Sequence, residues 1–285
     1  MRTNRFSLRV SLVVVGLVAA ACGGSGTETT SGAAGCEPGE MELVQEGTLT
    51  VATGEPAFPP WVIDDDPTNQ QGFEAAVAYA VAGEMGFTPE QVTWVRTGFD
   101  QAIAPGPKTF DFNLQQYAVT PERDEVVDFS DPYYVTAQAL VAFADSPVVA
   151  ADTVDDLKGY ILGAQIGTTS LAYIEEIIQP DTAPPVYDDN SAAKAALEAG
   201  QVDALVFDVP TAYYITSAEI PESTIVGVLE TSEEQADHLA MLFADGNSLV
   251  PCVNEALATL RTAGTLDALA EEWLAQEGAI KTITR

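Results

Sequence analysis

The stretch FDFNLQQYAVTPERDEVVDFSDPYY, residues 110–134, carries the most informative cation of the chain. In it, Arg123 stands behind a strand-like segment and in front of an aromatic turn. Cations are scarce, because the 285 residues include 11 Lys and Arg against 43 Asp and Glu. An arginine fork can bind a carboxylate through two parallel hydrogen bonds. Arg123 is therefore a candidate anchor for a small carboxylate, although a surface ion pair with Glu122 or Asp124 would give the same pattern.

On both sides of this stretch, strand-like and helix-like segments alternate. GTLTVAT, residues 47–53, has a short β pattern, and FEAAVAYAVAGEMG, residues 73–86, places apolar side chains on one helical face. The same order returns in a second unit, with a strand at 160–167 and a helix at 168–179. Such alternation predicts an α/β fold with mostly parallel sheets and helices on their faces.

The second half continues the pattern. The predicted segments are a helix at 191–200, a buried strand at 202–208, a helix start at 209–215, a strand at 238–246, and helices at 248–264 and 265–276. Two modest domains, each with its own core, fit this length.

The first residues have the composition of an export signal. Three arginines precede the apolar run 11–20, which is too short to span a membrane. Small residues directly before Cys22 match the processing box of bacterial lipoproteins, and the Gly/Ser/Thr-rich segment 23–35 is typical of a flexible tether. We expect a signal peptide at 1–21 and a lipidated cysteine with its tether at 22–44. An ordinary signal peptide with a chance cysteine is the alternative.

Two further cysteines, Cys36 and Cys252, would oxidise outside the cell. A disulfide between them would contribute about 2–4 kcal/mol, whereas two free thiols remain the alternative. A metal site is disfavoured, because His238 is the sole histidine and no cysteine pair has ligand spacing. The formal net charge of −32 makes nucleic acid an implausible partner.

Four motifs in this order carry a resemblance to a known family. They are GEPAFPPW at 54–61, the Arg123 segment, GAQIGTTS at 163–170 and VDALVFDVP at 202–210. Over residues 45–280 the chain resembles the family 3 solute-binding proteins, the extracytoplasmic amino-acid receptors of ABC importers. The resemblance implies a two-lobed periplasmic binding protein fold of type II, with a mostly parallel sheet and flanking helices in each lobe and a cleft between the lobes.

The resemblance also implies a division of the chain and a role. Lobe 1 would comprise 45–140 plus 240–285, and lobe 2 would comprise 141–239. The chain would be the substrate-binding subunit of an importer, binding a polar amino acid between the lobes and delivering it to a permease and its ATPase. We expect no catalysis, no cofactor, a monomer, and a location on the outer face of the cytoplasmic membrane, anchored through lipid on Cys22.

Charged and hydroxyl groups of the site follow from the resembled positions. Arg123 would hold the ligand's α-carboxylate, and Thr169, together with Thr168, would close on it from the other lobe at a helix start. Asp208, at the carboxyl end of a predicted strand, would hold the α-ammonium. A plain helix N-cap is the alternative for the threonines and also suits Asp208.

Aromatic and amide side chains would complete the pocket. Phe58 and Phe99 match two aromatic walls, which could hold an aliphatic stem or a flat cation. Glu55 stands at a position that often touches ligand and favours a cationic or strongly polar side chain. Trp61 is either core or pocket edge, and Gln116 stands where glycine or serine is frequent, which predicts an amide-lined pocket.

Two rival functions remain at this point. A few proteins of the resembled fold are dehydratases of small carboxylic acids, and Glu55 would then be the general acid. A sensory receptor that reports an amino acid to a partner is the second rival. The acidic run 64–66 could in principle hold calcium, but it lacks the spacing of a calcium loop and favours a solvated loop.

Overall fold

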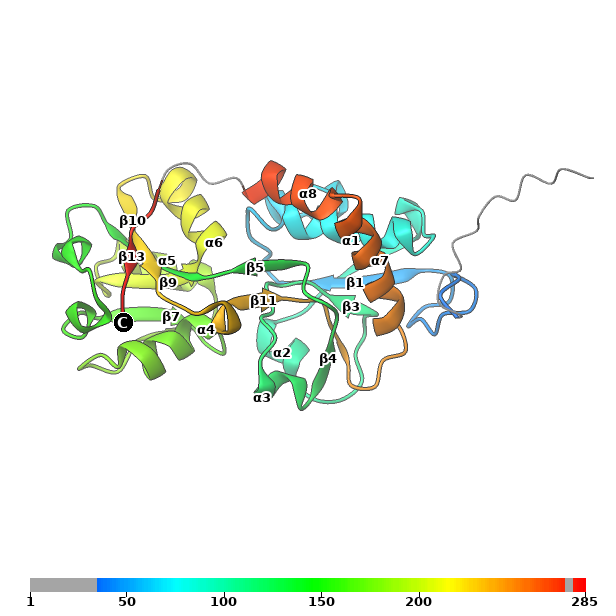
Figure 1. The fold of residues 1–285 in the computed structure, drawn as a ribbon, viewed down its shortest axis with the longest axis horizontal. Helices are drawn as coiled ribbons and strands as arrows, with labels where there is room; N and C mark the ends of the chain where they lie inside the picture. Colours follow the sequence, from blue (N-terminus) through cyan, green and yellow to red (C-terminus); the bar gives the residue numbers. More distant parts are fainter. Residues whose placement is uncertain (1–34, 275–278) are drawn as a thin grey trace, which may run out of the picture. The chain divides into compact units, whose positions relative to one another are not determined.

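The computed structural model describes residues 35–274 and 279–285. The predicted signal peptide and Cys22 lie outside the described residues. The described chain contains a five-stranded sheet, a six-stranded sheet and a two-stranded ribbon (Figure 1).

The five-stranded sheet has the order β2-β1-β3-β12-β4. Its strands are β1 (Leu49–Thr53), β2 (Val92–Arg96), β3 (Phe112–Asn113), β4 (Val127–Phe129) and β12 (Leu242–Ala244). Helices α1 (Phe73–Glu84), α7 (Val250–Thr262) and α8 (Thr265–Leu274) pack against one another, and their apolar side chains share a core with Leu49 and Val51. The short helix α2 (Phe99–Ile103) shares a second core with Ala52, because neighbouring residues of β1 face opposite sides of the sheet.

The six-stranded sheet has the order β13-β10-β6-β9-β7-β8. Its strands are β6 (Gln138–Phe143), β7 (Leu162–Gln165), β8 (Val186–Tyr187), β9 (Ala204–Asp208), β10 (Ser223–Leu229) and β13 (Thr282–Ile283). The helices of this half are α4 (Thr169–Ala172), α5 (Asn190–Glu198) and α6 (Val209–Tyr214), with π-helical turns continuing α4 and α6. Leu140 belongs to one buried cluster and Val141 to another, so this sheet is covered on both faces.

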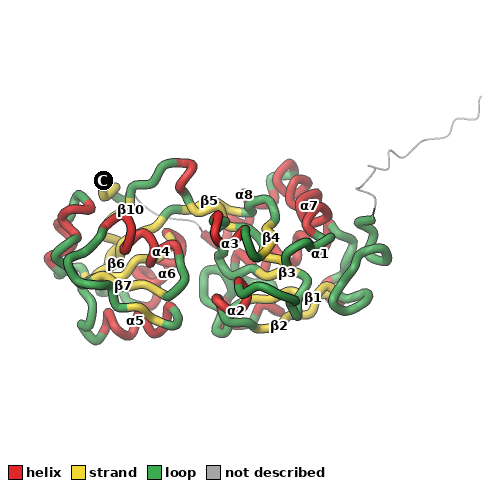
Figure 2. The backbone as a smooth tube through the Cα atoms, turned by 90° about the horizontal axis from the view of Figure 1, so that it is seen from below, coloured by secondary structure: helices red, strands yellow, loops and turns green. Residues whose placement is uncertain are grey.

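Each sheet is mostly parallel, as predicted, with one antiparallel strand. Parallel pairs join β1 to β2 and β3, and β7 to β8 and β9, as the alternating sequence requires. Strand β12, however, enters the first sheet antiparallel, and β6 enters the second antiparallel to both of its neighbours. Those strands follow crossings between the sheets, and a crossing brings the chain in from the opposite direction. Figure 2 shows the strands of the two sheets as separate groups.

Two antiparallel strands, β5 (Tyr134–Thr136) and β11 (Asp237–Leu239), connect the two halves. The predicted strand at 238–246 is therefore two strands in different sheets. Because β6 already begins at Gln138, the first crossing lies slightly before the expected boundary at 140. Strand β13 pairs with β10, so the last residues join the second sheet. The prediction that all of 240–285 belongs to lobe 1 is therefore wrong for these residues.

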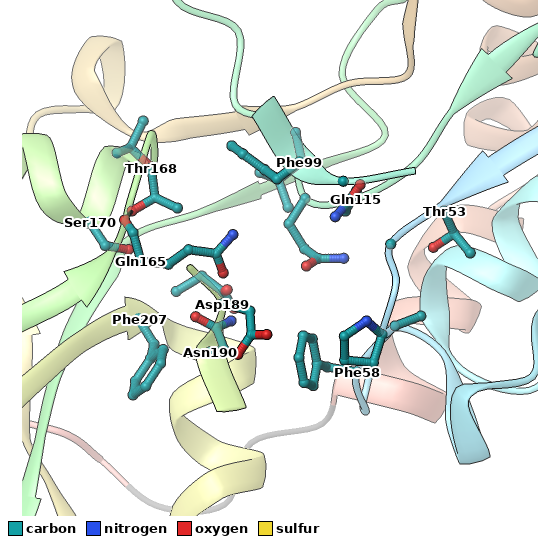
Figure 3. A pocket seen from close by; sticks show the side chains of 18 of the residues that line it. Thr53, Phe58, Phe99, Gln115, Gln165, Thr168, Ser170, Asp189, Asn190 and Phe207 are labelled. Atoms are coloured by element: carbon teal, nitrogen blue, oxygen red, sulfur yellow. Dashed lines mark hydrogen bonds between the residues drawn. The ribbon is translucent and has the colours of Figure 1, made fainter. Parts of the chain in front are cut away.

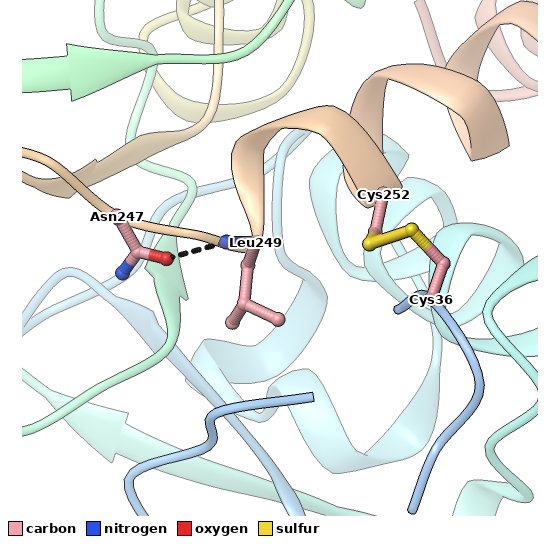
Figure 4. Close-up of a disulfide and its surroundings, with 4 residues drawn as sticks. All are labelled: Cys36, Asn247, Leu249 and Cys252. Carbon is pink, nitrogen blue, oxygen red and sulfur yellow. Dashed lines mark hydrogen bonds between the residues drawn. A yellow bond between two sulfur atoms is a disulfide. The ribbon is translucent and has the colours of Figure 1, made fainter. Parts of the chain in front are cut away.

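The predicted disulfide is present and ties the N-terminal arm to α7. Cys36 and Cys252 are bonded with their Cα atoms 5.4 Å apart (Figure 4). Close to it, the amide of Leu249 donates to Asn247 Oδ1 over 2.8 Å just before the helix begins. Within the described ranges, the structure has neither a helix with the length and apolarity to cross a membrane nor a cluster of residues suited to a metal ion.

Candidate functional site

A cavity of about 250 Å³ lies where the loops of both sheets meet. Strands β1, β7 and β9 end at its rim, which is the edge where α/β sheets bind ligands. In Figure 3, Thr53, Phe58, Phe99 and Gln115 approach it from one side, and Gln165, Thr168, Ser170 and Phe207 from the other. The predicted site residues that line it are Glu55, Phe58, Phe99, Gln116, Arg123, Thr168, Thr169 and Asp208.

Arg123 is buried at the wall of this cavity. It lies on the short helix α3 (Pro121–Asp124), whose cap Thr120 accepts a hydrogen bond from the Arg123 amide. Its side chain is 8% exposed and donates to the carbonyl oxygens of Ala118 (2.6 Å) and Gly167 (2.8 Å). The guanidinium carbon lies 5.4 Å from the ring centre of Phe99. The surface ion pair considered from the sequence is not formed among the described residues, and burial lowers the pKa of Arg123.

The two threonines have different local partners. Thr168 is the N-cap of α4, since its hydroxyl accepts from the amide of Leu171 at 3.2 Å and donates to the carbonyl of Gln165 at 2.7 Å. The hydroxyl of Thr169 accepts from Gln138 Nε2 at 3.3 Å. The capping alternative therefore holds for Thr168, while both residues also face the cavity.

Asp208 ends β9 and caps α6. Its Oδ1 accepts from the Thr211 amide and its Oδ2 from the Thr211 hydroxyl, both over 2.8 Å. Burial, together with the nearby Asp237, raises the pKa of Asp208 to about 6, although the hydrogen bonds from Thr211 lower it. The capping role is present, and the same carboxylate lines the cavity.

Asp237 and Gln138 are site residues that the sequence analysis missed. Asp237, 8% exposed, lies on β11 and accepts from the Gln138 side-chain amide. Gln138 sits opposite Asp208 in the pairing of β6 with β9, and its Oε1 accepts from the Ser170 hydroxyl at 2.5 Å. Burial raises the pKa of Asp237, while Gln138, Thr169 and the positive Arg123 lower it. The sequence signal for Asp237 is an acid just before the apolar segment 239–243.

Glu74 is a second missed acid, placed behind Gln116. Gln116 has a left-handed backbone (φ 52°) and donates to Glu74 through its amide (2.7 Å) and its side chain (2.5 Å). Tyr133 also donates its hydroxyl to Glu74. Burial raises the pKa of Glu74 to about 7, although all three hydrogen bonds oppose that rise. The buried carboxyl group of Glu74 thus fixes the position of Gln116, and a side-chain amide suits this position because it can donate to that carboxyl group.

The predicted aromatic walls have partners on their outer faces. Phe99 stacks on Tyr117 with ring centres 4.7 Å apart. Phe58 faces Lys194, whose Nζ lies 5.6 Å from the ring centre and also pairs with Glu219 at 2.7 Å. Both rings therefore sit beside cations while lining the cavity.

Trp61, which the sequence left as either core or pocket edge, is not among the residues that line the cavity. It is 1% exposed and belongs to the core around α1, with its ring edge-on to Phe73 at 6.0 Å. The large apolar indole gains more from burial in this core than from a polar pocket. Its N–H donates to the hydroxyl of Thr211 over 2.8 Å.

The charges around the cavity are strongly unbalanced. Its acidic lining residues are Glu55, Asp188, Asp189, Asp208 and Asp237, and among the described residues Arg123 is the lone basic one of the lining. A guest whose carboxylate occupies Arg123 would leave this acidic surplus to attract positive charge elsewhere on the guest.

Comparisons with known proteins agree with this architecture. The sequence pattern of the bacterial extracellular solute-binding proteins, family 3, matches residues 49–276. The L-cystine-binding protein TcyJ of Escherichia coli (strain K12) is 28% identical over 240 residues, covering 83% of this chain and 86% of that protein.

Solved structures of the same type are also similar. An ancestral arginine-binding protein bound to arginine superposes with a TM-score of 0.68 at 30% identity, covering 80% of this chain and 99% of that one. The ancestral amino acid-binding protein AncCDT-1, a precursor of cyclohexadienyl dehydratase, has a TM-score of 0.67 at 29% identity, covering 80% and 96%. Each of these two comparisons covers nearly all of the solved chain, so the likeness concerns the whole fold.

Proposed function

Because this chain belongs to the bacterial extracellular solute-binding proteins, family 3, we propose that it is the extracytoplasmic substrate-binding subunit of an amino-acid ABC importer. An amino acid would enter the cavity between the lobes, and closure of the lobes would bury it. The closed form would present it to a permease driven by an ATPase. The relatives named above are binding proteins, which supports this role over an enzymatic one.

One observation carries the proposal: the buried arginine of helix α3 and the carboxylate at the end of β9, which belong to different halves of the chain, line the same cavity. A zwitterion leaves water only if both of its charges find partners. Arg123, with Thr168 and Thr169 opposite, would bind the α-carboxylate, and Asp208 would bind the α-ammonium.

The acidic surplus supports a ligand with a cationic side chain, such as L-arginine, L-lysine or L-ornithine. Once one acid is neutralised by the α-ammonium, the remaining acidic lining residues still outnumber the cations of the pocket. Phe58 and Phe99 could hold the aliphatic part or stack on a guanidinium group. An acidic ligand such as L-glutamate would meet like charges and should be rejected.

Calorimetry with matched probes tests this assignment. L-arginine should bind, agmatine should bind far more weakly because it lacks the carboxylate, and 5-guanidinopentanoate should also bind far more weakly because it lacks the α-ammonium. L-glutamine and L-glutamate report the contribution of side-chain charge. Tighter binding of L-glutamate than of L-arginine and L-lysine would contradict the proposed ligand class.

The dehydratase alternative has one observation in its favour, the similarity to a precursor of cyclohexadienyl dehydratase. Glu55, at the cavity, would be the general acid in such a reaction. In the binding role no bond is made or broken, so a bound ligand should be recovered chemically unchanged after long incubation. NMR spectra that show consumption of a small carboxylic acid would favour the enzyme instead.

The location follows from the leader. We place the protein at the outer face of the cytoplasmic membrane, held by lipid on Cys22. Two acyl chains anchor a protein stably, whereas a single chain does so only marginally. Replacing Cys22 by serine should release the exported protein into a soluble fraction.

Neighbouring genes for a permease and an ATPase would distinguish transport from sensing.

A further inference from the structure

A chain of hydrogen bonds runs from the core beside the first sheet to the candidate ammonium site of the second. Trp61 Nε1 lies 2.8 Å from Thr211 Oγ1, and this oxygen lies 2.8 Å from Asp208 Oδ2. Trp61 follows β1, whereas Thr211 is in the first turn of α6, 150 residues later. The contact therefore bridges the two lobes.

The chemistry of the three groups fixes the direction of these bonds. An indole N–H can only donate, and an ionised carboxylate can only accept. The hydroxyl of Thr211 has one proton, which must point to Asp208 while its lone pair accepts from Trp61. Each bond polarises the next, so the indole strengthens the donation to Asp208.

Burial makes this contact costly to break without replacement. Trp61 is 1% exposed and Thr211 4% exposed, and the indole ring packs edge-on against Phe73 and Tyr134. A buried N–H that loses its acceptor is left without a hydrogen-bond partner, which is unfavourable. In this structure the indole has this acceptor, and a motion that parted the lobes would remove it.

We infer that Trp61 and Thr211 are positioning residues that couple closure of the lobes to the orientation of the Asp208 carboxylate. This inference rests on the proposed function, because it gives Asp208 the ammonium of the guest. Neither residue need touch the ligand. When the lobes close, the Trp61 N–H donates to the Thr211 hydroxyl, which in turn donates to Asp208 Oδ2. These bonds keep the Asp208 carboxylate ionised and oriented toward the ammonium of the guest.

Other groups also act on Asp208 and must be kept constant in a test. Asp237 on β11 and Glu74 on α1 face it electrostatically, as do the hydroxyls of Tyr133 and Tyr134. The hydroxyl of Thr211 lowers the pKa of Asp208, so removing it should raise that pKa further. Substitution of Thr211 leaves all four neighbours in place, whereas Trp61→Phe also alters the ring that packs against Tyr134.

A ligand-free measurement tests the contact itself. In protein labelled with ¹⁵N-tryptophan, the indole resonance of Trp61 is identified by its loss in Trp61→Phe. We expect slow hydrogen exchange of this N–H in the wild type and at least tenfold faster exchange in Thr211→Val, with Thr211→Ser restoring protection. Equal exchange rates in the wild type and Thr211→Val would overturn the inference, whatever the ligand.

A second measurement tests the coupling to binding, with L-arginine as the probe. Thr211→Val should weaken binding about tenfold and Trp61→Phe about threefold, while Thr211→Ser should stay close to the wild type. The double variant should be no weaker than Thr211→Val alone, because both changes interrupt one chain.

The pH profile separates this role from simple loss of packing. The acid limb of L-arginine binding should shift to higher pH in Thr211→Val, and Thr211→Ser should return it to the wild-type position. An unshifted limb, or fully additive losses in the double variant, would overturn the coupling. Failure of the wild type to bind L-arginine would instead count against the proposed ligand class and leave the exchange test decisive.

Discussion

Arg123 Nη2 donates to the carbonyl oxygen of Gly167 over 2.8 Å, which joins α3 of one lobe to the turn after β7 of the other. Gly167 has φ +71°, and a Cβ built on it would lie 2.3 Å from Asp100 Oδ1. An arginine has five N–H donors, so these contacts leave donors of Arg123 for a carboxylate in the cavity. The carbonyl of Gly167 thus links one lobe to the arginine of the other lobe that is proposed to bind the carboxylate.

Substitution at this glycine should therefore affect closure. Gly167→Ala places a methyl group where the Asp100 carboxylate lies, so we expect binding of L-arginine to weaken at least tenfold in calorimetry. Gly200→Ala is the matched control, because Gly200 has a similar φ of +66° but open space around its Cβ position. Both variants should lose about 1–2 kcal/mol of stability, because the left-handed backbone is unfavourable for alanine. Equal affinity losses in the two variants would contradict a contact between the lobes at Gly167.

Removal of the buried guanidinium of Arg123 should remove the main binding partner of the ligand's carboxylate. Arg123→Ala should weaken binding of L-arginine by about 2–5 kcal/mol, since a charged group of the guest is left unpaired. The weak binding of agmatine, which has no carboxylate, should change little. Arg261→Ala removes an exposed arginine of α7 that donates to the Pro132 carbonyl and should leave affinity unchanged. A wild-type affinity in Arg123→Ala, measured by calorimetry, would refute this anchor.

The buried carboxyl group of Glu74 should make stability depend on pH. Its pKa is raised to about 7 in the folded protein from 4.5, so between these values the folded state holds more protons than the unfolded state. Stability from this group is therefore full at low pH and declines as pH rises from 4.5 to 7. Urea unfolding between pH 5 and 8 should show this decline, and Glu74→Gln should flatten it.

The control for that measurement is Glu84→Gln, an exposed position of the same helix α1. It should retain the wild-type slope of stability against pH. A wild-type slope in Glu74→Gln would show that another group is responsible.

The disulfide should stabilise the fold without affecting the site. Replacing Cys36 and Cys252 by serine removes a link that closes a loop spanning 216 positions of sequence separation, and should cost about 2–4 kcal/mol in urea unfolding. The link joins the N-terminal arm to α7, away from the residues that line the cavity. L-arginine affinity at 25 °C should be unchanged. A large loss of affinity in a still folded variant would show that the arm contributes to the site.

Much of the fold and site could be predicted because the signals are local. The strand that ends at Asp208, the glycine turn before Thr168 and the isolated Arg123 are each visible in a few neighbouring residues, and all of them lie at the cavity. The pairing of Cys36 with Cys252 also followed from compartment and cysteine count. Trp61 was ambiguous, because an aromatic residue beside a predicted pocket has the same sequence pattern in core and in site.

The sequence by itself determined most of the alternating helices and strands and the chemical groups available, because periodicity and turn residues act over a few positions. Only the tertiary structure decided which surfaces meet. It brought Asp237 and Gln138 to the cavity through the crossing strands, placed β13 in the second sheet, and put Trp61 against Thr211. Such contacts depend on which apolar faces are buried together, and that is a property of the whole chain rather than of any segment.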